Sequence, residues 1–588
     1  MVEGITKEGN RYRKLTSVLL AGVLACGTVA APVAALADDG TAGTVTINGN
    51  STNPGGYSAY KIFSGDVTAG QTPANKLANI DWASTNMAKA VMNSINSIKA
   101  GTFDKTELAI TATGNDASMA SAQKAAQWMH DNVTGGADGT DSTKVNTDRS
   151  VTNKNLQYDA AAKKIANAVY AAGDAAAYTL TAGQAASFAD GYYVIVNTAS
   201  VTGTDEMGTA PIFTTAGGAP VTAIEKTSTP TVKKEVTDDA TGAKLATVAD
   251  ADTGQNLAYT LTGTIASNFN DFDDYYYQFT DTLSGLDMQN SDTSSVKVAV
   301  DGKDVTTKAK IAYNKDAGKL TVAFDDLKDC GVALTTASKV VVTYNAHLTA
   351  AASTAAAGND NTVALTYASD PMNNSHATTK PDSVKTHAYK LHLQKQDRST
   401  NKALAGAQFT IQQNKGDEGT TMYVKADGSL TANKADAILS TNDSGVLEVS
   451  GLDVGTYTLH EETVPANYNA VPDSTFTIAA TYNNNDATAT LTNTVAGGKD
   501  AFAGQLVFAG LGNDQASANA AKGDNATAIA SSGVVNVTVE DVKTVEMPLT
   551  GEQGIMLIEI LGVGVVGISV AAAMRNRRKD ASQSQVQA

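Results

Sequence analysis

The chain has 588 residues, which by length alone is enough for about four domains. Its 43 Lys and Arg residues against 60 Asp and Glu residues give a formal net charge of −17, so no nucleic-acid partner is expected, because phosphates would repel the protein. Two cysteines exclude a disulfide-stapled scaffold, and six scattered histidines without an HExxH pair give no reason to expect a metal or a cofactor.

Residues 1–37 have the three parts of a secretory signal peptide. A basic segment precedes an apolar stretch that ends near Ala31, and Ala-Leu-Ala at 35–37 is a small-x-small cleavage site. The alternatives are an N-terminal membrane helix and a lipoprotein signal at Cys26. We expect export and removal of 1–37, because the other end of the chain supplies an anchor.

Residues 38–225 form the N-terminal block, which is predicted to be mixed α+β because its apolar period changes from two to 3.6 and back. The expected strands are 43–47, 57–63 and 192–197, and the last of these closes the block. The expected helices are 86–99, 117–132 and 159–171.

Residues 226–386 (the middle block) and 387–546 (the last block) are predicted to be all-β. Short alternating runs separated by turns recur in both, for example at 296–300, 340–344 and 446–449. This pattern is typical of β-sandwiches. The predicted fold is therefore mainly β, with tandem Ig-like β-sandwich domains after a mixed N-terminal domain.

Two lysines stand where a strand should turn an apolar residue inward. In PTVKKEV, the period of two places Lys234 on the inner face with Val232 and Val236, whereas Lys233 points outward. In LHLQKQD, it places Lys395 inward with two leucines. Burial of a lone ammonium costs several kcal/mol, so two such cases, each near the start of a predicted β domain, suggest a use.

Burial favours the neutral amine of a lysine, and the neutral amine is a nucleophile. An Asn or Asp side chain beside it, with a carboxylic acid to shuttle protons, can give a Lys–Asn or Lys–Asp amide with loss of ammonia or water. The sequence therefore suggests self-made crosslinks in a chain that folds outside the cell without an internal disulfide.

Residues 547–588 hold a five-residue motif, an apolar span and a basic tail. The motif consists of Met547, Pro548, Leu549, Thr550 and Gly551. The order of the three parts resembles the cell-wall sorting signal of Gram-positive surface proteins, whose motif is LPxTG. The resemblance implies that a sortase cleaves between Thr550 and Gly551 and holds Thr550 as a thioester until an amine attacks it.

The apolar span covers 554–574, long enough for a transmembrane helix, and basic residues from Arg575 onward would stay in the cytoplasm. Glu559 lies inside the span, where an acid is costly, so the helix is expected to anchor the chain only until sorting. The protein is then expected on the outside of the cell, joined to peptidoglycan.

Two longer stretches resemble isopeptide-bonded Gram-positive pilins. Residues 229–371 look like a fimbrial isopeptide-forming, CnaA-like domain. The stretches that carry this resemblance are PTVKKEV, AYTLTGTI, YYYQFTDTLSGL and GNDNTVALTYASDP. Residues 389–546 look like a CnaB domain. The stretches that carry this resemblance are LHLQKQD and YTLHEETVPANY, and the second resembles the E-box motif of CnaB domains.

The resemblance assigns roles in the middle block by motif position. Lys234 is the nucleophile, Asp281 of FTDTL is the autocatalytic acid, and Asn361 is the acceptor, with Asn359 as the alternative. The implied bond joins the first and last strands of the domain.

In the last block, Lys395 is the nucleophile by the same resemblance, and Glu461 takes the E-box position. The acceptor is Asp541, at the position about six residues before the sorting motif, and Asn493 is the alternative.

In the N-terminal block, Lys61 and Asn197 could form a third pair without an obvious acid, or Lys61 could simply be exposed.

Polymerisation of such pilins requires a lysine that attacks the Thr550 thioester of the next subunit. The usual YPK-like text is absent, and Lys226 lies at the equivalent place, with Lys233 as the alternative. When one site on each copy is joined to a different site on the next copy, the assembly does not close into a ring, so it grows into a fibre.

The resemblance implies a structural shaft subunit of a covalent pilus, located in the cell wall and fimbrium, that supports adhesion. Its partners would be other copies of itself, pilus-specific and housekeeping sortases, minor pilins, peptidoglycan and host surface ligands. The alternative is a non-polymerised, wall-anchored adhesin or a tip or basal pilin. No enzyme is indicated, because GxSxG, a Cys/His pair and a phosphate loop are all absent.

Overall fold

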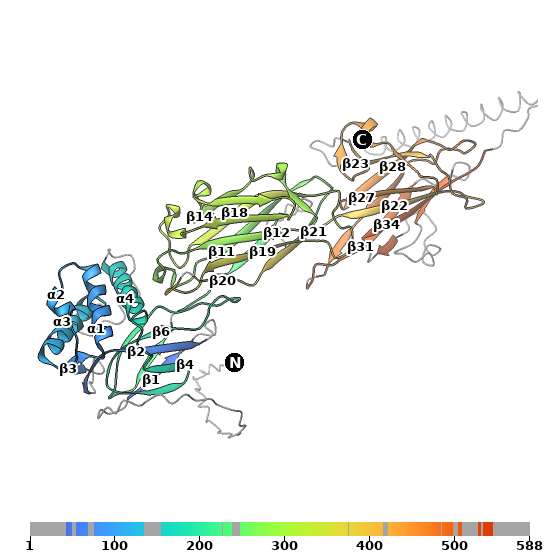
Figure 1. The fold of residues 1–588 in the computed structure, drawn as a ribbon. Coiled ribbons are helices and arrows are strands. Elements are labelled where there is room, and N and C mark those ends of the chain that lie inside the picture. The colour runs from blue at the N-terminus through green and yellow to red at the C-terminus, as the bar shows by residue number, and fades with distance from the viewer. Residues whose placement is uncertain are drawn as a thin grey trace, which may run out of the picture.

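The computed structural model describes residues 43–49, 55–68, 76–133, 154–225, 227–237, 247–373, 375–414, 421–483, 485–497, 504–508, 527–530 and 533–544. The predicted signal peptide, Lys226 and the predicted sorting signal with its apolar span lie outside these residues. Across the described ranges, no helix is long and apolar enough to cross a membrane. The chain is mainly β and lies as three blocks in a row, with the helices gathered in the first of them (Figure 1).

The N-terminal block has the predicted mixture of strands and helices. One sheet has the order β5-β1-β8, and the other has the order β3-β2-β6-β7 with β4 beside β2. The strands are β1 (Gly43–Asn48), β2 (Gly56–Thr68), β3 (Lys76–Trp82), β4 (Tyr178–Thr181), β5 (Ala185–Phe188), β6 (Gly191–Asn197), β7 (Ile212–Ala216) and β8 (Val221–Ile224). The helices are α1 (Thr85–Ile98), α2 (Lys105–Leu108), α3 (Asp116–Asn132) and α4 (Lys154–Tyr170).

The strand at 192–197 does not close this block, contrary to the prediction. It is β6, and the short strands β7 and β8 follow it. β7 pairs with β6, and β8 adds to β1 in parallel. Both strands have only four or five residues, too few for the alternation of apolar residues to stand out in the sequence.

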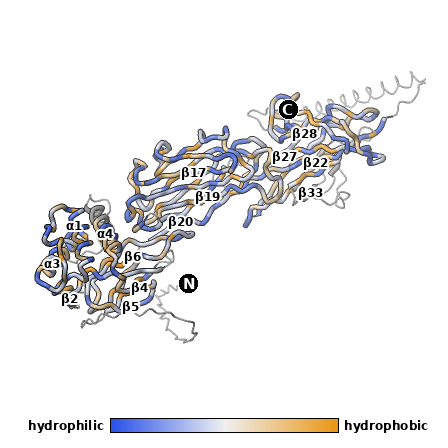
Figure 2. The backbone as a smooth tube through the Cα atoms, viewed as in Figure 1, coloured by the Kyte–Doolittle hydropathy of each residue, from blue (hydrophilic) through white to orange (hydrophobic). Residues whose placement is uncertain are grey.

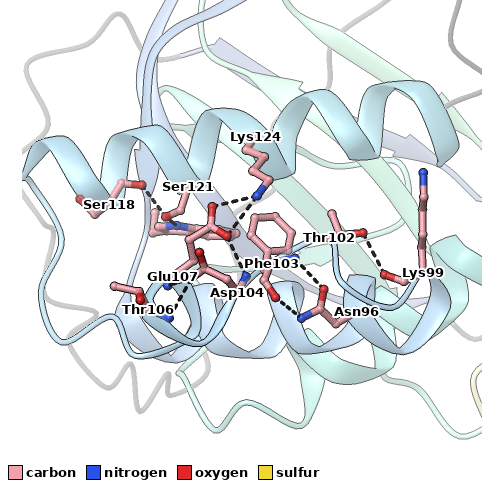
Figure 3. A network of polar contacts seen from close by, with 11 residues as sticks. Asn96, Lys99, Thr102, Phe103, Asp104, Thr106, Glu107, Ser118, Ser121 and Lys124 are labelled. Atoms are coloured by element: carbon pink, nitrogen blue, oxygen red, sulfur yellow. Dashed lines mark hydrogen bonds and ion pairs between the residues drawn. The ribbon is translucent and has the colours of Figure 1, made fainter.

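Local hydrogen bonds fix where the short helix α2 and its neighbour lie (Figure 3). Asp104 caps α2 by accepting from the backbone amides of Thr106 and Glu107, and the Glu107 carboxylate accepts from the Asp104 amide in return. Lys124 of α3 then pairs with Glu107 at 2.9 Å. These contacts join α2 to α3.

The middle block is a sandwich of two sheets. The β19 sheet has the order β10-β21-β19-β12-β17-β16, with β20 beside β19, and the β9 sheet has the order β15-β14-β18-β11-β9, with β13 beside β18. The first comprises β10 (Val248–Asp250), β12 (Tyr277–Leu283), β16 (Lys310–Asn314), β17 (Lys319–Phe324), β19 (Asn359–Ala368), β20 (His376–Thr378) and β21 (Asp382–His387). The second comprises β9 (Val232–Val236), β11 (Asn256–Thr264), β13 (Leu286–Met288), β14 (Lys297–Val300), β15 (Lys303–Asp304) and β18 (Lys339–Leu348).

The last block also has two sheets. The β22 sheet has the order β27-β22-β34-β32, and the β28 sheet has the order β25-β24-β23-β28-β29-β31-β30, with β26 beside β23 and β33 beside β31. The first comprises β22 (Tyr389–Asp397), β27 (Val446–Leu452), β32 (Gly504–Phe508) and β34 (Val534–Asp541). The second comprises β23 (Gln408–Asn414), β24 (Thr421–Val424), β25 (Leu430–Thr431), β26 (Leu439–Ser440), β28 (Gly455–Thr463), β29 (Ser474–Ile478), β30 (Ala480–Tyr482), β31 (Ala489–Gly497) and β33 (Thr527–Ala530).

Alternation of apolar and polar residues explains both sandwiches. Every second residue is buried along β11 and β18, and hydrophilic and hydrophobic residues alternate along many strands of both blocks (Figure 2). The inward residues of each block make a separate core, with Tyr277, Phe279 and Val342 in the middle block and Leu391, Phe409 and Val537 in the last.

The segment 201–208 of the N-terminal block runs along the middle block. Met207 is buried in the middle core, and the amide of Gly208 donates to the carbonyl of Ser369 at 2.7 Å. Lys163 of α4 also pairs with Asp273 of the middle block at 2.8 Å. The first two blocks are therefore joined by contacts as well as by the chain.

Candidate functional site

Lys234 is buried in the middle block, as its position in β9 predicts. Its side chain is fully enclosed, whereas the Lys233 side chain is 63 % exposed and pairs with Glu235. The Lys234 Nζ donates to both carboxylate oxygens of Asp281 at 2.6 Å and to the hydroxyl of Tyr344 at 3.0 Å. A single strand thus presents one lysine to solvent and the next to the core.

Asp281 and Asn361 reach the same place from the facing sheet. In the antiparallel pairing of β12 with β19, Asp281 lies opposite Val363 and Leu283 lies opposite Asn361. Asp281 and Asn361 are therefore diagonal neighbours on one face, and both are fully buried. Lys234 comes from the β9 sheet, so the site spans the sandwich.

Tyr344 of β18 connects the members of this site. The Asn361 amide nitrogen donates to the Tyr344 hydroxyl at 2.8 Å, and that hydroxyl donates to Asp281 Oδ2 at 2.5 Å. The other amide atom, Asn361 Oδ1, is buried and has no hydrogen-bond partner among the described residues. Sequence reasoning missed Tyr344, although the alternation in VVVTY places it inward with Val340 and Val342.

Asn359, the alternative acceptor, is engaged elsewhere. Its amide accepts from the Ser353 amide at 2.8 Å and donates to the carbonyls of Ser353 and Thr386. It holds a loop against β21, and no hydrogen bond of the described residues joins it to Lys234.

The electrostatics of the middle site favour a reactive amine. Burial lowers the pKa of Lys234 to about 8, against the opposing attraction of Asp281. Burial raises the pKa of the Tyr344 phenol well above its usual value, and the nearby Asp281 carboxylate acts in the same direction. The tyrosine is therefore neutral, and a minor fraction of the lysine is already the neutral amine near pH 7.

Lys395 and Asp541 meet in the last block. β22 and β34 are neighbouring parallel strands in which Lys395 lies opposite Val539 and Asp397 lies opposite Asp541. Lys395 Nζ donates to Asp541 Oδ1, and both side chains are fully buried. Lysine and acceptor therefore share one sheet here, unlike in the middle block.

Glu461 reaches Lys395 from the facing β28 sheet. Its Oε1 lies 2.7 Å from Lys395 Nζ, an ion pair without the angle of a hydrogen bond, and its Oε2 accepts from the Val471 amide at 2.9 Å. The neighbouring Glu462 turns to the other face and contacts Thr410 and Lys434. The two glutamates of the E-box thus have different surroundings.

Asp541 combines two properties of an acceptor. Burial raises the pKa of its carboxyl group to about 7, although Lys395 lowers it, so both protonation states are populated near neutral pH. Its Oδ2 has no hydrogen-bond partner among the described residues. The alternative acceptor, Asn493, lies on β31 in the other sheet, and its side chain is outside the described residues.

The possible pair in the N-terminal block is not brought together. In the pairing of β2 with β6, Lys61 lies opposite Tyr193, whereas Asn197 lies opposite Tyr57. The two are four positions apart along the strands, or about 13 Å. Lys61 Nζ instead donates to the carbonyl of Asp190 at 3.0 Å.

Comparisons with known proteins agree with a β-sandwich architecture. A family model described as SpaA, prealbumin-like fold domain, matches residues 389–495. No curated protein matches the chain.

Within the described residues, no group of three or more His, Cys, Asp or Glu side chains could hold a metal ion.

Solved structures of pilins are similar to parts of the chain. The T6 backbone pilin of serotype M6 Streptococcus pyogenes is 16 % identical with a TM-score of 0.47, over 75 % of this chain and 83 % of that one. The full-length major pilin SpaD from Corynebacterium diphtheriae is 16 % identical with a TM-score of 0.39, over 73 % and 88 %. The full-length major pilin RrgB from Streptococcus pneumoniae is 14 % identical with a TM-score of 0.34, over 51 % and 79 %.

Proposed function

We propose that the chain is a structural subunit of a covalently polymerised cell-surface pilus, strengthened by two intramolecular isopeptide bonds. One observation carries the proposal: two fully enclosed lysines each contact a carboxylic acid beside a candidate acceptor. Lys234 contacts Asp281 and shares the Tyr344 hydroxyl with Asn361. Lys395 contacts both Glu461 and Asp541. If these lysines had no chemical role, burying a charge in each of two cores would lower stability, because an ion pair often does not recover the cost of removing the charges from water.

In the middle block, the proposed bond joins Lys234 Nζ to the side-chain carbon of Asn361. Asp281 takes a proton from the ammonium, the neutral amine attacks the carboxamide carbon, and the amide nitrogen leaves as ammonia. Of the three protons on Lys234, one stays in the new amide, one leaves with the ammonia and one remains on Asp281.

In the last block, Lys395 attacks the carboxyl carbon of Asp541, and water leaves. Of the three protons on the Lys395 ammonium, one first passes to the Asp541 carboxylate, one is carried by Glu461 from the attached nitrogen to the departing oxygen, and one stays in the new amide. The raised pKa of Asp541 supports this step, because a neutral carboxyl group is a better electrophile than a carboxylate.

Between subunits, we propose that sortase cleaves after Thr550 and transfers its acyl group to Lys226 of the next copy. The last subunit is transferred to peptidoglycan, which leaves the fibre in the cell wall. The described residues include neither Lys226 nor the sorting signal, so this step rests on the sequence motifs.

The mature chain, residues 38–550, is expected to be lighter than its sequence by one ammonia and one water, because each bond expels one small molecule. Intact-mass spectrometry measures this directly. Asp281→Ala should restore only the ammonia, and Glu461→Ala only the water, since each acid serves one site. A wild-type mass equal to the plain sequence mass would refute both bonds, and the loss of two ammonias would identify Asn493 as the acceptor.

Wall extracts of cells that make the protein are expected to give a ladder of high-mass bands on a denaturing gel, because amide bonds between subunits survive detergent and heat. The detection uses an antibody against the middle block. A matched strain without the pilus-type sortase should lose the ladder. A single band at the monomer mass in the wild type would instead indicate an anchored adhesin or a tip or basal pilin.

A further inference from the structure

We propose that Tyr344 is a catalytic residue of the middle crosslink, and that its hydroxyl group delivers a proton to the nitrogen that leaves Asn361. The inference rests on the proposed Lys234–Asn361 bond and adds a step to it. It follows from three hydrogen bonds of one buried hydroxyl group.

The Tyr344 hydroxyl lies between the acid and the leaving group. It donates to Asp281 Oδ2 at 2.5 Å and accepts from the Asn361 amide nitrogen at 2.8 Å and from Lys234 Nζ at 3.0 Å. Within the described residues, no hydrogen bond joins Asp281 to Asn361 directly. The route from the acid to the departing nitrogen therefore passes through this hydroxyl.

The ring of Tyr344 is held in place by its neighbours. It is 1 % exposed, and it stacks on the ring of Tyr259 with centroids 5.3 Å apart and planes 12° apart. Burial keeps its phenol protonated, as described above. The hydroxyl can therefore act as a donor without a large movement of the side chain.

The direction of the hydrogen bonds changes as the reaction proceeds. Once Asp281 has taken a proton from Lys234, it becomes the donor in its contact with Tyr344, and the hydroxyl proton is free to turn toward Asn361. The planar amide nitrogen has no available lone pair, but it gains one when the amine adds and the carbon becomes tetrahedral. Only then can the nitrogen accept the proton.

The protons balance in this relay. Tyr344 gives its proton to the Asn361 nitrogen, takes one from Asp281, and Asp281 takes one from the attached Lys234 nitrogen. The carbon–nitrogen bond then breaks with release of ammonia, and the electron pair on the oxygen re-forms the carbonyl. Tyr344 ends as it began, and Asp281 holds the one remaining proton.

Among the described residues of the last block, no hydroxyl group makes such a contact with the lysine. There the ring of Phe409 lies 5.3 Å from Lys395 Nζ, and the amine touches both Glu461 and the acceptor Asp541 directly. An oxygen leaves from that site, and the acid needs no intermediary. Tyr344 therefore lies at the site where ammonia leaves from Asn361.

The test compares Tyr344→Phe with Tyr259→Phe in the mature chain, residues 38–550. Tyr259 is the matched control, because it is equally buried in the same block and its hydroxyl contacts Thr386 at 2.7 Å. Each chain is made by cell-free translation, synthesis is stopped, and the loss of ammonia from the middle block is followed by mass spectrometry. Loss of water in the last block and the melting curve report folding.

We expect Tyr344→Phe to slow ammonia loss by about 100-fold or more, the usual contribution of a general acid, and Tyr259→Phe to react at the wild-type rate. Equal rates for wild type and Tyr344→Phe, or equal slowing in both variants, would overturn the role of Tyr344. A wild type that never loses ammonia would refute the proposed bond itself.

A second variant keeps the test decisive if the phenylalanine chain does not fold. Replacement of Tyr344 by 3-fluorotyrosine preserves the ring and the hydroxyl group but makes the phenol more acidic. A changed rate of ammonia loss, with a changed pH dependence, supports proton donation by Tyr344. A rate and pH dependence identical to those of the wild type would overturn it.

Discussion

Asn361→Ala is expected to lower the free energy of unfolding of the middle block by about 4–5 kcal/mol, because it removes the proposed crosslink and leaves the Lys234–Asp281 pair in place. The bond closes a loop on the order of 100 residues, and by analogy with a disulfide this restricts the unfolded chain. The loss is a large share of the ~5–15 kcal/mol that stabilises a domain. Calorimetry should show a melting temperature lower by about 10–20 °C.

The variant also loses the hydrogen bond between Asn361 and Tyr344, which a double-mutant cycle separates from the crosslink. In an Asp281→Ala background no bond can form, so Asn361→Ala there measures only the lost packing and hydrogen bond. The difference between the two effects is the contribution of the crosslink. If Asn361→Ala has the same effect in both backgrounds, Asn361 makes no covalent bond.

Lys226→Ala is expected to abolish the ladder of polymers while monomer remains on the wall. The substitution removes only the amine that we propose attacks the Thr550 acyl group of the next subunit. The sorting motif is intact, so an amine of the cell-wall peptide can still take the acyl group. Denaturing gels of wall extracts, with an antibody against the middle block, measure both species.

Lys233→Ala is the matched control, since it removes an exposed lysine seven residues further along the chain. Its ladder should equal that of the wild type, apart from any effect of losing its contact with Glu235. A ladder that persists in Lys226→Ala and disappears in Lys233→Ala would make Lys233 the linking residue.

The proposed bonds would carry tension differently in the two blocks. In the last block, Lys395 and Asp541 lie near the C-terminal ends of the first and last described strands, β22 and β34. A pull along the chain would run through β22, cross the bond and leave after Asp541. The strands between them would carry no load.

In the middle block the expected connection of the first and last strands is wrong, because Asn361 lies near the start of β19 and the strands β20 and β21 follow it. A pull entering at Lys234 would cross to Asn361 and then pass through β19 to β21. These three strands stay in the path of the force. The bond instead joins the two facing sheets of the sandwich, which should resist their separation.

The sequence predicted the core-facing lysines because the period of two along a strand is a local property. Lys234 and Lys395 turn inward for the same reason as the valines and leucines beside them, whereas Lys233, before Lys234, is exposed. The tandem β-sandwich architecture followed from the same alternation. The strands β7 and β8 escaped prediction because they are too short to show it.

The tertiary structure gives a geometric reason to prefer Asn361 over Asn359 as the partner of Lys234. Asn359 and Asn361 are two positions apart on β19 and both face inward, so alternation cannot separate them. The pairing of β12 with β19 sets Asn361 beside Asp281, while Asn359 lies at the strand end against the loop at Ser353. Strand register is a long-range property, set by contacts between distant segments.

By itself, the sequence determined which residues have side chains able to form a crosslink and which side of a strand they occupy. Residue type and the alternation along a strand are both local properties of the sequence. Only the tertiary structure decided that Tyr344 lies between acid and amide, and that the middle site spans two sheets whereas the last site lies between neighbouring strands. These relations depend on how strands far apart in the chain pair and face one another, and no local pattern encodes that geometry.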